Sequence, residues 1–149
     1  ALLGTVIYPK SAGEREGEVT RLLASLLKLL PAVALVALPA FWLVGERVIG
    51  LLFGTAFVGA SSAAFWLLPG IVCLSGGILI NNFLAGKGYP WILHGAAGAG
   101  LVANVALNWA WIPRHGITGA ALASSVSYGL WLLVLAVYFR RRYLVAAQN

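Results

Sequence analysis

The sequence has few of the residues that carry acid–base chemistry. It contains no aspartate and only four glutamates, which we expect in loops between hydrophobic segments. The two histidines, His94 and His115, are far apart in sequence, and the membrane topology derived below places them on opposite sides, so they cannot share a metal ion. No serine–histidine–acid or cysteine–histidine set can be assembled. We therefore expect neither an enzyme, nor a metal site, nor a bound cofactor.

Charge and cysteine are also scarce. Only 9% of the residues are charged and 61% are hydrophobic, where soluble domains have ~25% and ~45–50%. This composition excludes a soluble globular domain, a disordered tail and a nucleic-acid-binding module. The net charge of +6 comes from basic residues isolated between long apolar runs, so a lipid surface is the anionic partner expected. The single cysteine, Cys73, allows no internal disulfide. The composition is that of an integral membrane protein.

The apolar runs divide into four spans. A bilayer core of ~30 Å needs about 20 apolar residues in a helix, and the chain offers such runs at about 22–44, 59–85, 91–112 and 117–139. A short interfacial segment, Val48–Phe57, separates the first two spans. Turns with a helix breaker and a charge, at 86–90 and 113–116, separate the others. The sequence therefore predicts an all-α membrane protein with four transmembrane helices.

The basic residues orient these spans. With four spans, both termini and the central loop share one side. That side carries Lys10, Arg15, Arg21, Lys28, Lys87, Arg140, Arg141 and Arg142, while Arg47 and Arg114 lie on the other. We expect both ends to be cytoplasmic in a multi-pass protein of the cell membrane.

The first eight residues look like the last turns of a preceding helix. Residues 1–8 are apolar or small but too few to span, and we expect them to end a preceding helix at Pro9. Residues 10–20 then form a polar cytoplasmic loop. The expected organisation is a helix end and loop at 1–20, a transmembrane domain at 21–139 and a basic cytoplasmic tail at 140–149.

A family resemblance appears in three segments, which occur in order. Residues 107–124, LNWAWIPRHGITGAALAS, resemble the "LN…IP…GI.GAA.A(T/S)" signature of polysaccharide flippases in the multidrug/oligosaccharidyl-lipid/polysaccharide exporter superfamily. Residues 49–57, IGLLFGTAF, are similar to the family's "i..LfG..f" segment, and 82–88, NFLAGKG, to its "l.a.Gk" loop. Pro9-Lys10-Ser11 resembles the loop before the family's ninth helix. The resemblance covers nearly the whole chain and corresponds to the last four helices of a twelve- to fourteen-helix transporter.

The resemblance implies a function. It implies a fragment of a bacterial or archaeal inner-membrane flippase that exports lipid-linked oligosaccharides by alternating access. The implied partners are the lipid bilayer, a glycan linked to undecaprenyl pyrophosphate, and the remaining helices of the transporter. Two alternatives stay open: a drug or small-molecule exporter of the same superfamily, and a stand-alone four-span scaffold protein.

Four polar side chains in the spans are candidates for the substrate path. Lys28 shares a helix face with Arg21 and Ser25; it either extends to the lipid headgroups or faces a water-filled cavity that attracts an anionic substrate. Asn104 and Asn108 are four residues apart on one face, deep enough that their amides need partners, so they either bond other helices or contact sugar. Asn81 lies near the cytoplasmic end of its span, where it either packs or lines the path.

Small residues predict close helix packing in the last two spans. Glycine and alanine at four-residue spacing allow two helix backbones to approach closely in a membrane. The candidate packing positions are Gly95, Ala99, Gly100, Gly116, Gly119 and Ala123.

Overall fold

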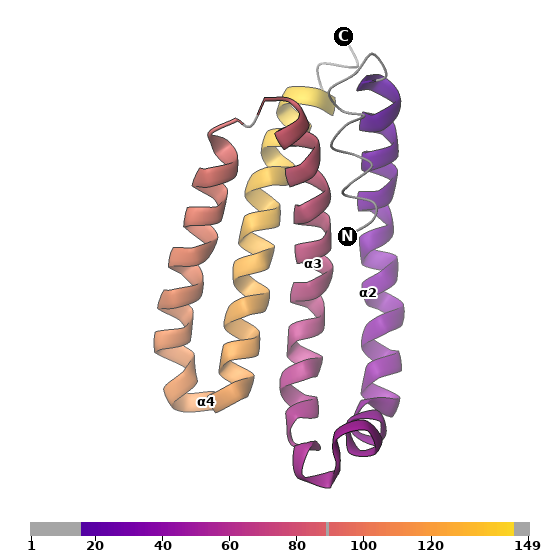
Figure 1. The fold of residues 1–149 in the computed structure, drawn as a ribbon, viewed down its shortest axis with the longest axis vertical. Helices are drawn as coiled ribbons and strands as arrows, with labels where there is room; N and C mark the ends of the chain where they lie inside the picture. The colour runs from indigo at the N-terminus through magenta and orange to yellow at the C-terminus, as the bar shows by residue number, and fades with distance from the viewer. Residues whose placement is uncertain (1–15, 89, 145–149) are drawn as a thin grey trace.

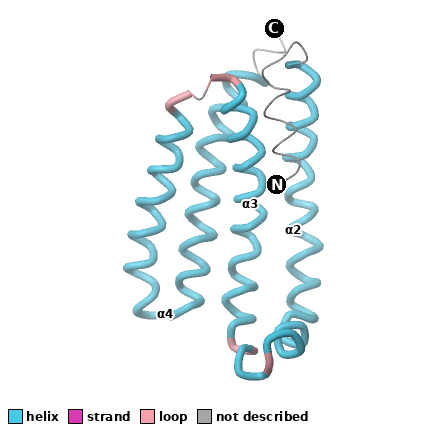
Figure 2. The backbone as a smooth tube through the Cα atoms, viewed as in Figure 1, coloured by secondary structure: helices cyan, strands magenta, loops and turns pink. Residues whose placement is uncertain are grey.

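A computed structural model describes residues 16–88 and 90–144, and every regular element in that part of the chain is helical. The element order is α2 (Glu16–Phe53), a short 3₁₀ turn η1 (Thr55–Phe57), α3 (Ala60–Gly86), α4 (Ile92–Phe139) and a π-helical turn η2 (Arg140–Leu144). The helices stand side by side along the long axis of the molecule and are joined by short loops (Figures 1 and 2). Three helices, Gly17–Phe53, Ala60–Gly86 and Ile92–Leu144, are long and apolar enough to cross a membrane.

The element α4 consists of two arms that fold back on each other. The helix is interrupted at Gly116, whose φ of 54° and ψ of −134° are not helical. At that point the chain reverses, so that the two arms lie antiparallel (Figure 1). The first arm corresponds to the expected span 91–112 and the second to 117–139. The reversal requires a backbone conformation that residues with a Cβ rarely adopt, which accounts for a glycine at this point.

The expected span at 59–85 corresponds closely to α3, whereas α2 departs from the sequence prediction at both ends. Residues 16–20, expected in a loop, already belong to the helix, and Val19 and Thr20 are buried. Glu18 therefore lies in a helix and not in a loop. The expected helix end at 1–8 and the first part of the expected loop, residues 10–15, lie outside the described residues.

At its other end α2 continues through Glu46 and Arg47, where a break was expected. Two exposed charges are compatible with helical hydrogen bonding, and no proline lies between Pro39 and the end of α2. The break comes at Gly54, whose φ is 92°. The expected interfacial segment Val48–Phe57 is therefore the end of α2 plus η1. In Figures 1 and 2 the last turns of α2 are seen end-on, so they run across the bundle axis.

The described part of the expected tail also differs. Residues 140–144 continue α4 as the π-helical turn η2, and 145–149 lie outside the described residues.

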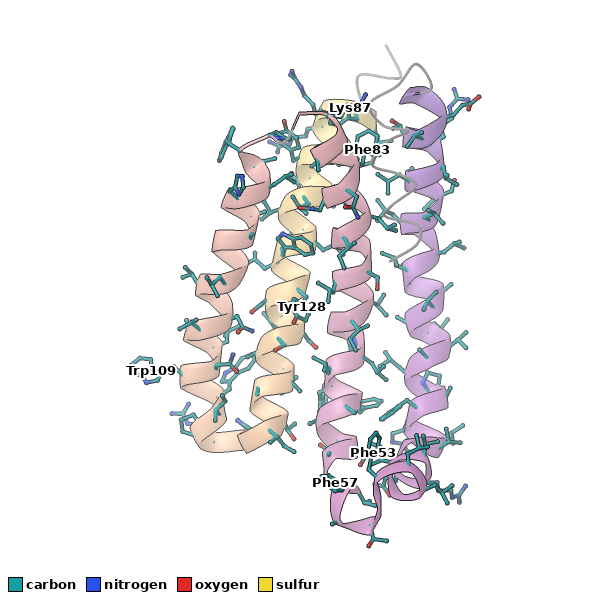
Figure 3. The ribbon with its side chains drawn as sticks, in the orientation of Figure 1. Phe53, Phe57, Phe83, Lys87, Trp109 and Tyr128 are labelled. Atoms are coloured by element: carbon teal, nitrogen blue, oxygen red, sulfur yellow. The ribbon has the colours of Figure 1, made fainter. Side chains whose placement is uncertain are left out.

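Fully buried side chains gather near the end of the bundle where α3 ends and α4 both begins and ends. Phe83, labelled in Figure 3, contacts Phe139 edge-on with 5.2 Å between ring centroids, and Tyr143 at 5.1 Å. The other large, fully buried residues are Leu23, Ile80, Leu84 and Leu135. By contrast, the middle of α2 is open: Leu35 is 76% exposed and Trp42 73%.

Glycines let α3 approach the second arm of α4. A Cβ on Gly70 would lie 2.6 Å from the Cα of Ser125, and one on Gly77 would lie 2.4 Å from the indole ring of Trp131. Neither glycine is among the packing positions expected from the sequence. Of those expected positions, Gly100, Gly119 and Ala123 are buried, Gly95 and Ala99 are exposed, and Gly116 forms the exposed turn.

Candidate functional site

The two arms of α4 bring a group of polar side chains together in the middle of apolar helices. Asn104 and Asn108 lie on the first arm, and Ser124, Ser127, Tyr128 and Trp131 lie on the second. Tyr128 lies about halfway along the bundle in Figure 3. Each arm is helical, so residues three, four and seven apart share a face, and 124, 127, 128 and 131 follow that spacing.

A chain of hydrogen bonds joins the two arms. The Asn108 side-chain amide donates to Oδ1 of Asn104 at 2.9 Å, and the Asn104 amide donates to Oγ of Ser124 at 3.5 Å. Ser127 donates within its own helix, to the carbonyl oxygen of Ala123 at 2.7 Å. The asparagines thus satisfy part of each other's hydrogen-bonding capacity, as amides in an apolar environment must.

Two buried polar atoms near this chain lack a partner among the described residues. They are Oδ1 of Asn108, which can accept a hydrogen bond, and Nε1 of Trp131, which can donate one. A buried polar atom that stays unpaired costs about 1–3 kcal/mol. Such atoms can be satisfied by a ligand or by water that enters the site.

A cavity of about 330 Å³ lies at this place. The polar side chains of Asn104, Ser124, Ser127, Tyr128 and Trp131 line it, together with the apolar residues Leu74, Ala97, Gly100 and Leu101. Its walls therefore come from α3 and from both arms of α4. The site combines amide and hydroxyl groups with two aromatic rings.

Gly77 makes room for the indole of Trp131, and Gly100 contacts the same residue from the other side. Gly77 on α3 lies so close to the ring that no Cβ would fit, and a Cβ on Gly100 would lie 3.5 Å from Cβ of Trp131. Trp131 is thereby held between α3 and the first arm, with its ring in the wall of the cavity. Substituting Gly77 would move the aromatic wall, whereas a Cβ at Gly100 would make only an ordinary contact.

Of the four path candidates, only Asn104 lines this cavity, and Asn108 hydrogen-bonds to it from one helical turn away. Lys28 is exposed on α2, and Asn81 is half-buried in α3, near the end of the bundle that carries Lys87. The structure therefore brings Asn104 and Asn108 together but does not bring Lys28 or Asn81 to them. Tyr128 and Trp131 were not selected from the sequence, although their spacing from Ser124 could have placed them on the same face.

A second set of hydroxyl contacts joins α3 to the second arm. Ser125 donates to the carbonyl oxygen of Trp66 at 2.6 Å, and the hydroxyls of Ser62 and Thr118 lie 3.3 Å apart. Pro69 removes the backbone N–H that would bond the carbonyl of Phe65, one residue before the Trp66 carbonyl that accepts from Ser125.

No family model matches this chain, and no match was found among curated proteins or solved structures.

Proposed function

We propose that this chain forms the C-terminal part of a membrane transporter that exports lipid-linked oligosaccharides, and that the cavity between α3 and α4 contacts the sugar portion of the substrate. The observation that carries this proposal is the cavity wall, in which the Asn104 amide and the unpaired Nε1 of Trp131 stand together with the ring of Tyr128. Sugar hydroxyls can accept hydrogen bonds from the Asn104 amide and from the indole. The apolar face of a sugar ring can pack against Tyr128 or Trp131.

The segment that resembles polysaccharide flippases supports the same assignment. Residues 107–124 include Asn108 and Ser124, and both hydrogen-bond to Asn104. They also include Gly116, at which the arms reverse. The segment thus contributes Ser124 to the cavity wall and Asn108 to the hydrogen-bond chain that reaches it.

In the proposed topology α2, α3 and each arm of α4 cross the membrane, and both ends of the chain are cytoplasmic. Lys87 and the arginines of η2 then meet one membrane surface, while Arg114 lies at the other, in accord with the positive-inside rule. The exposed apolar side chains of α2 face lipid or the remaining helices of the transporter. Those helices enclose the path, and the substrate crosses by alternating access.

Binding of a defined lipid tests this proposal. The chain in neutral detergent is titrated with an undecaprenyl-pyrophosphate-linked oligosaccharide and, separately, with undecaprenyl pyrophosphate without sugar. The sugar-bearing lipid is expected to bind more tightly. Asn104→Leu should weaken its binding about three- to tenfold, because an interhelical-type hydrogen bond in a membrane is worth about 0.6–1.4 kcal/mol.

The matched control is Asn82→Leu, the same substitution at a half-buried asparagine of α3 that does not line the cavity. It should leave binding unchanged. Equal affinities for the two lipids, or equal losses in the two variants, would contradict sugar recognition by the cavity.

The reading frame upstream of the Ala1 codon tests whether the chain is part of a larger transporter. Eight or so further hydrophobic spans in that frame would support the proposal. A start codon immediately before Ala1 would contradict it and favour a four-span scaffold protein.

A further inference from the structure

A second cavity, distinct from the asparagine site, opens where α4 begins and where it ends. It measures about 660 Å³ and forms a groove along the second arm of α4. Its lining residues are Ile92 from the first arm, Leu133, Val134, Val137 and Tyr138 from the second arm, and Arg141 and Arg142 from η2. We call it the arginine groove.

The residues of the arginine groove form two rows with a step of four. One row is Leu133, Val137 and Arg141, and the other is Val134, Tyr138 and Arg142. In an α-helix, residues four apart advance by about 40° beyond a full turn, so such rows drift around the helix. The wider π-helical turn at 140–144 opposes this drift. The two arginines therefore stay above the apolar part of the groove.

An aromatic cluster fixes the turn that carries the arginines. Tyr143 of η2 packs edge-on against Phe83 of α3 at 5.1 Å and stacks on Phe139 at 5.9 Å, measured between ring centroids. Phe83 and Phe139 are fully buried. The backbone of η2 is thus held against α3, while Arg141 and Arg142 are exposed on the groove side.

The charge and the shape of the groove indicate its occupant. Both lining arginines are exposed, make no ion pair with the described residues, and have no acidic residue beside them in the groove. Below them Leu133 is 59% exposed and Val137 42%. From Leu133 to Arg141 the helix rises about 12 Å, which approaches the ~15 Å half-thickness of the hydrocarbon core. A free phosphate ion needs only the arginines, whereas a lipid also needs the apolar length.

We infer that the arginine groove binds an anionic phospholipid of the surrounding bilayer, with its phosphate at Arg141 and Arg142 and an acyl chain along Leu133 and Val137. The Tyr138 hydroxyl can donate to the same headgroup. Guanidinium groups bind phosphate through two parallel hydrogen bonds, and basic pockets between membrane helices are suited to anionic headgroups. The inference requires membrane insertion but not glycan transport, because the groove shares no residue with the asparagine cavity.

Native mass spectrometry of the intact chain in neutral detergent tests the inference. Phosphatidylglycerol is compared with phosphatidylcholine of the same acyl chains. Phosphatidylglycerol is expected to bind more tightly. Arg141→Gln and Arg142→Gln should each weaken its binding about fivefold, the factor that corresponds to roughly 1 kcal/mol for a basic residue near an anionic surface.

Arg140→Gln is the matched control, because Arg140 is exposed, carries the same charge and does not line the groove. It should change binding less than twofold. Arg141→Lys should retain most of the affinity, and Val137→Phe should lower it by filling the groove without altering charge.

Four results would overturn the inference. Equal binding of the two phospholipids would exclude recognition of the headgroup. Equal losses of phosphatidylglycerol affinity in Arg140→Gln and Arg141→Gln would indicate nonspecific electrostatic attraction. Competition by glycerol 3-phosphate at the same concentration as the lipid would show that the acyl chain is not bound. Stronger binding of undecaprenyl pyrophosphate than of phosphatidylglycerol would assign the groove to a transport substrate. That last outcome would leave the sugar test at Asn104 unaffected.

Discussion

Substituting Gly70 by alanine places a methyl group where α3 meets the second arm of α4. The new Cβ would lie 2.6 Å from both the Cα and the Oγ of Ser125. Ordinary contacts between carbon atoms are ~3.5–4.0 Å long. Because one of the two contacted atoms belongs to the backbone, rotating a side chain cannot relieve the overlap. The two helices must instead separate by roughly 1 Å.

Two energetic terms follow from that separation. Overpacking of this kind costs about 1–3 kcal/mol. The Ser125 hydrogen bond to the Trp66 carbonyl, 2.6 Å long, is stretched as well, and such a bond contributes about 0.6 kcal/mol in a membrane protein. Alanine also stabilises a helix by about 1 kcal/mol relative to glycine. Gly129→Ala on α4, where a Cβ would meet nothing within 4 Å, isolates that last term.

The measurement compares the free energies of unfolding of Gly70→Ala and Gly129→Ala. In equilibrium unfolding by dodecyl sulfate in mixed micelles, followed by tryptophan fluorescence, Gly70→Ala should be roughly 2–3 kcal/mol less stable than Gly129→Ala. Ser125→Gly in the Gly70→Ala background removes two of the three close atoms and should restore part of the loss. If the two alanine variants are equally stable, the helices do not approach at Gly70 and the packing argument fails.

Three further predictions concern other parts of the bundle. Gly116→Ala should lower the free energy of unfolding by about 1–3 kcal/mol, because φ of 54° with ψ of −134° strains a residue that has a Cβ. An unchanged unfolding midpoint in dodecyl sulfate would mean that the turn relaxes without cost. Phe83→Ala should cost about 3–5 kcal/mol in the same assay, since it empties a fully buried position between two aromatic rings; a loss below 1 kcal/mol would be inconsistent with that packing. If Lys28 attracts an anionic substrate, Lys28→Gln should abolish export by the full transporter in cells while Lys28→Arg largely spares it; equal export by both variants would remove Lys28 from the mechanism.

The sequence predicts the helical segments of this chain well because their lengths and ends depend on local features. The expected span 59–85 is close to α3. The expected turn at 113–116 includes Gly116, where the chain reverses. The predicted first span ends at residue 44, whereas α2 continues to Phe53. The difference arises because Glu46 and Arg47 were treated as a break. A pair of charges weakens membrane insertion but does not disrupt helical hydrogen bonds, whereas Gly54 with its positive φ does.

The faces of the helices were harder to predict than their ends. In a soluble helix the polar side marks the surface, but helices that are apolar all round give no such signal. Asn104 and Asn108 were found because amides are rare in apolar segments. Tyr128 and Trp131 were missed because aromatic residues are common there, and only the folding of the second arm against the first brings them to the cavity.

The open outer surface of α2 has a consequence for how the gene tolerates change. Positions such as Leu35, Val36 and Leu43 are 66–76% exposed, so any apolar side chain of similar hydrophobicity should serve there. Gly70 and Gly77 admit no side chain without moving a neighbouring helix. A saturation mutagenesis profile of the chain would therefore be permissive along most of α2 and would show narrow intolerant positions on α3. Sequence drift should accumulate in α2 while the α3–α4 contact stays fixed.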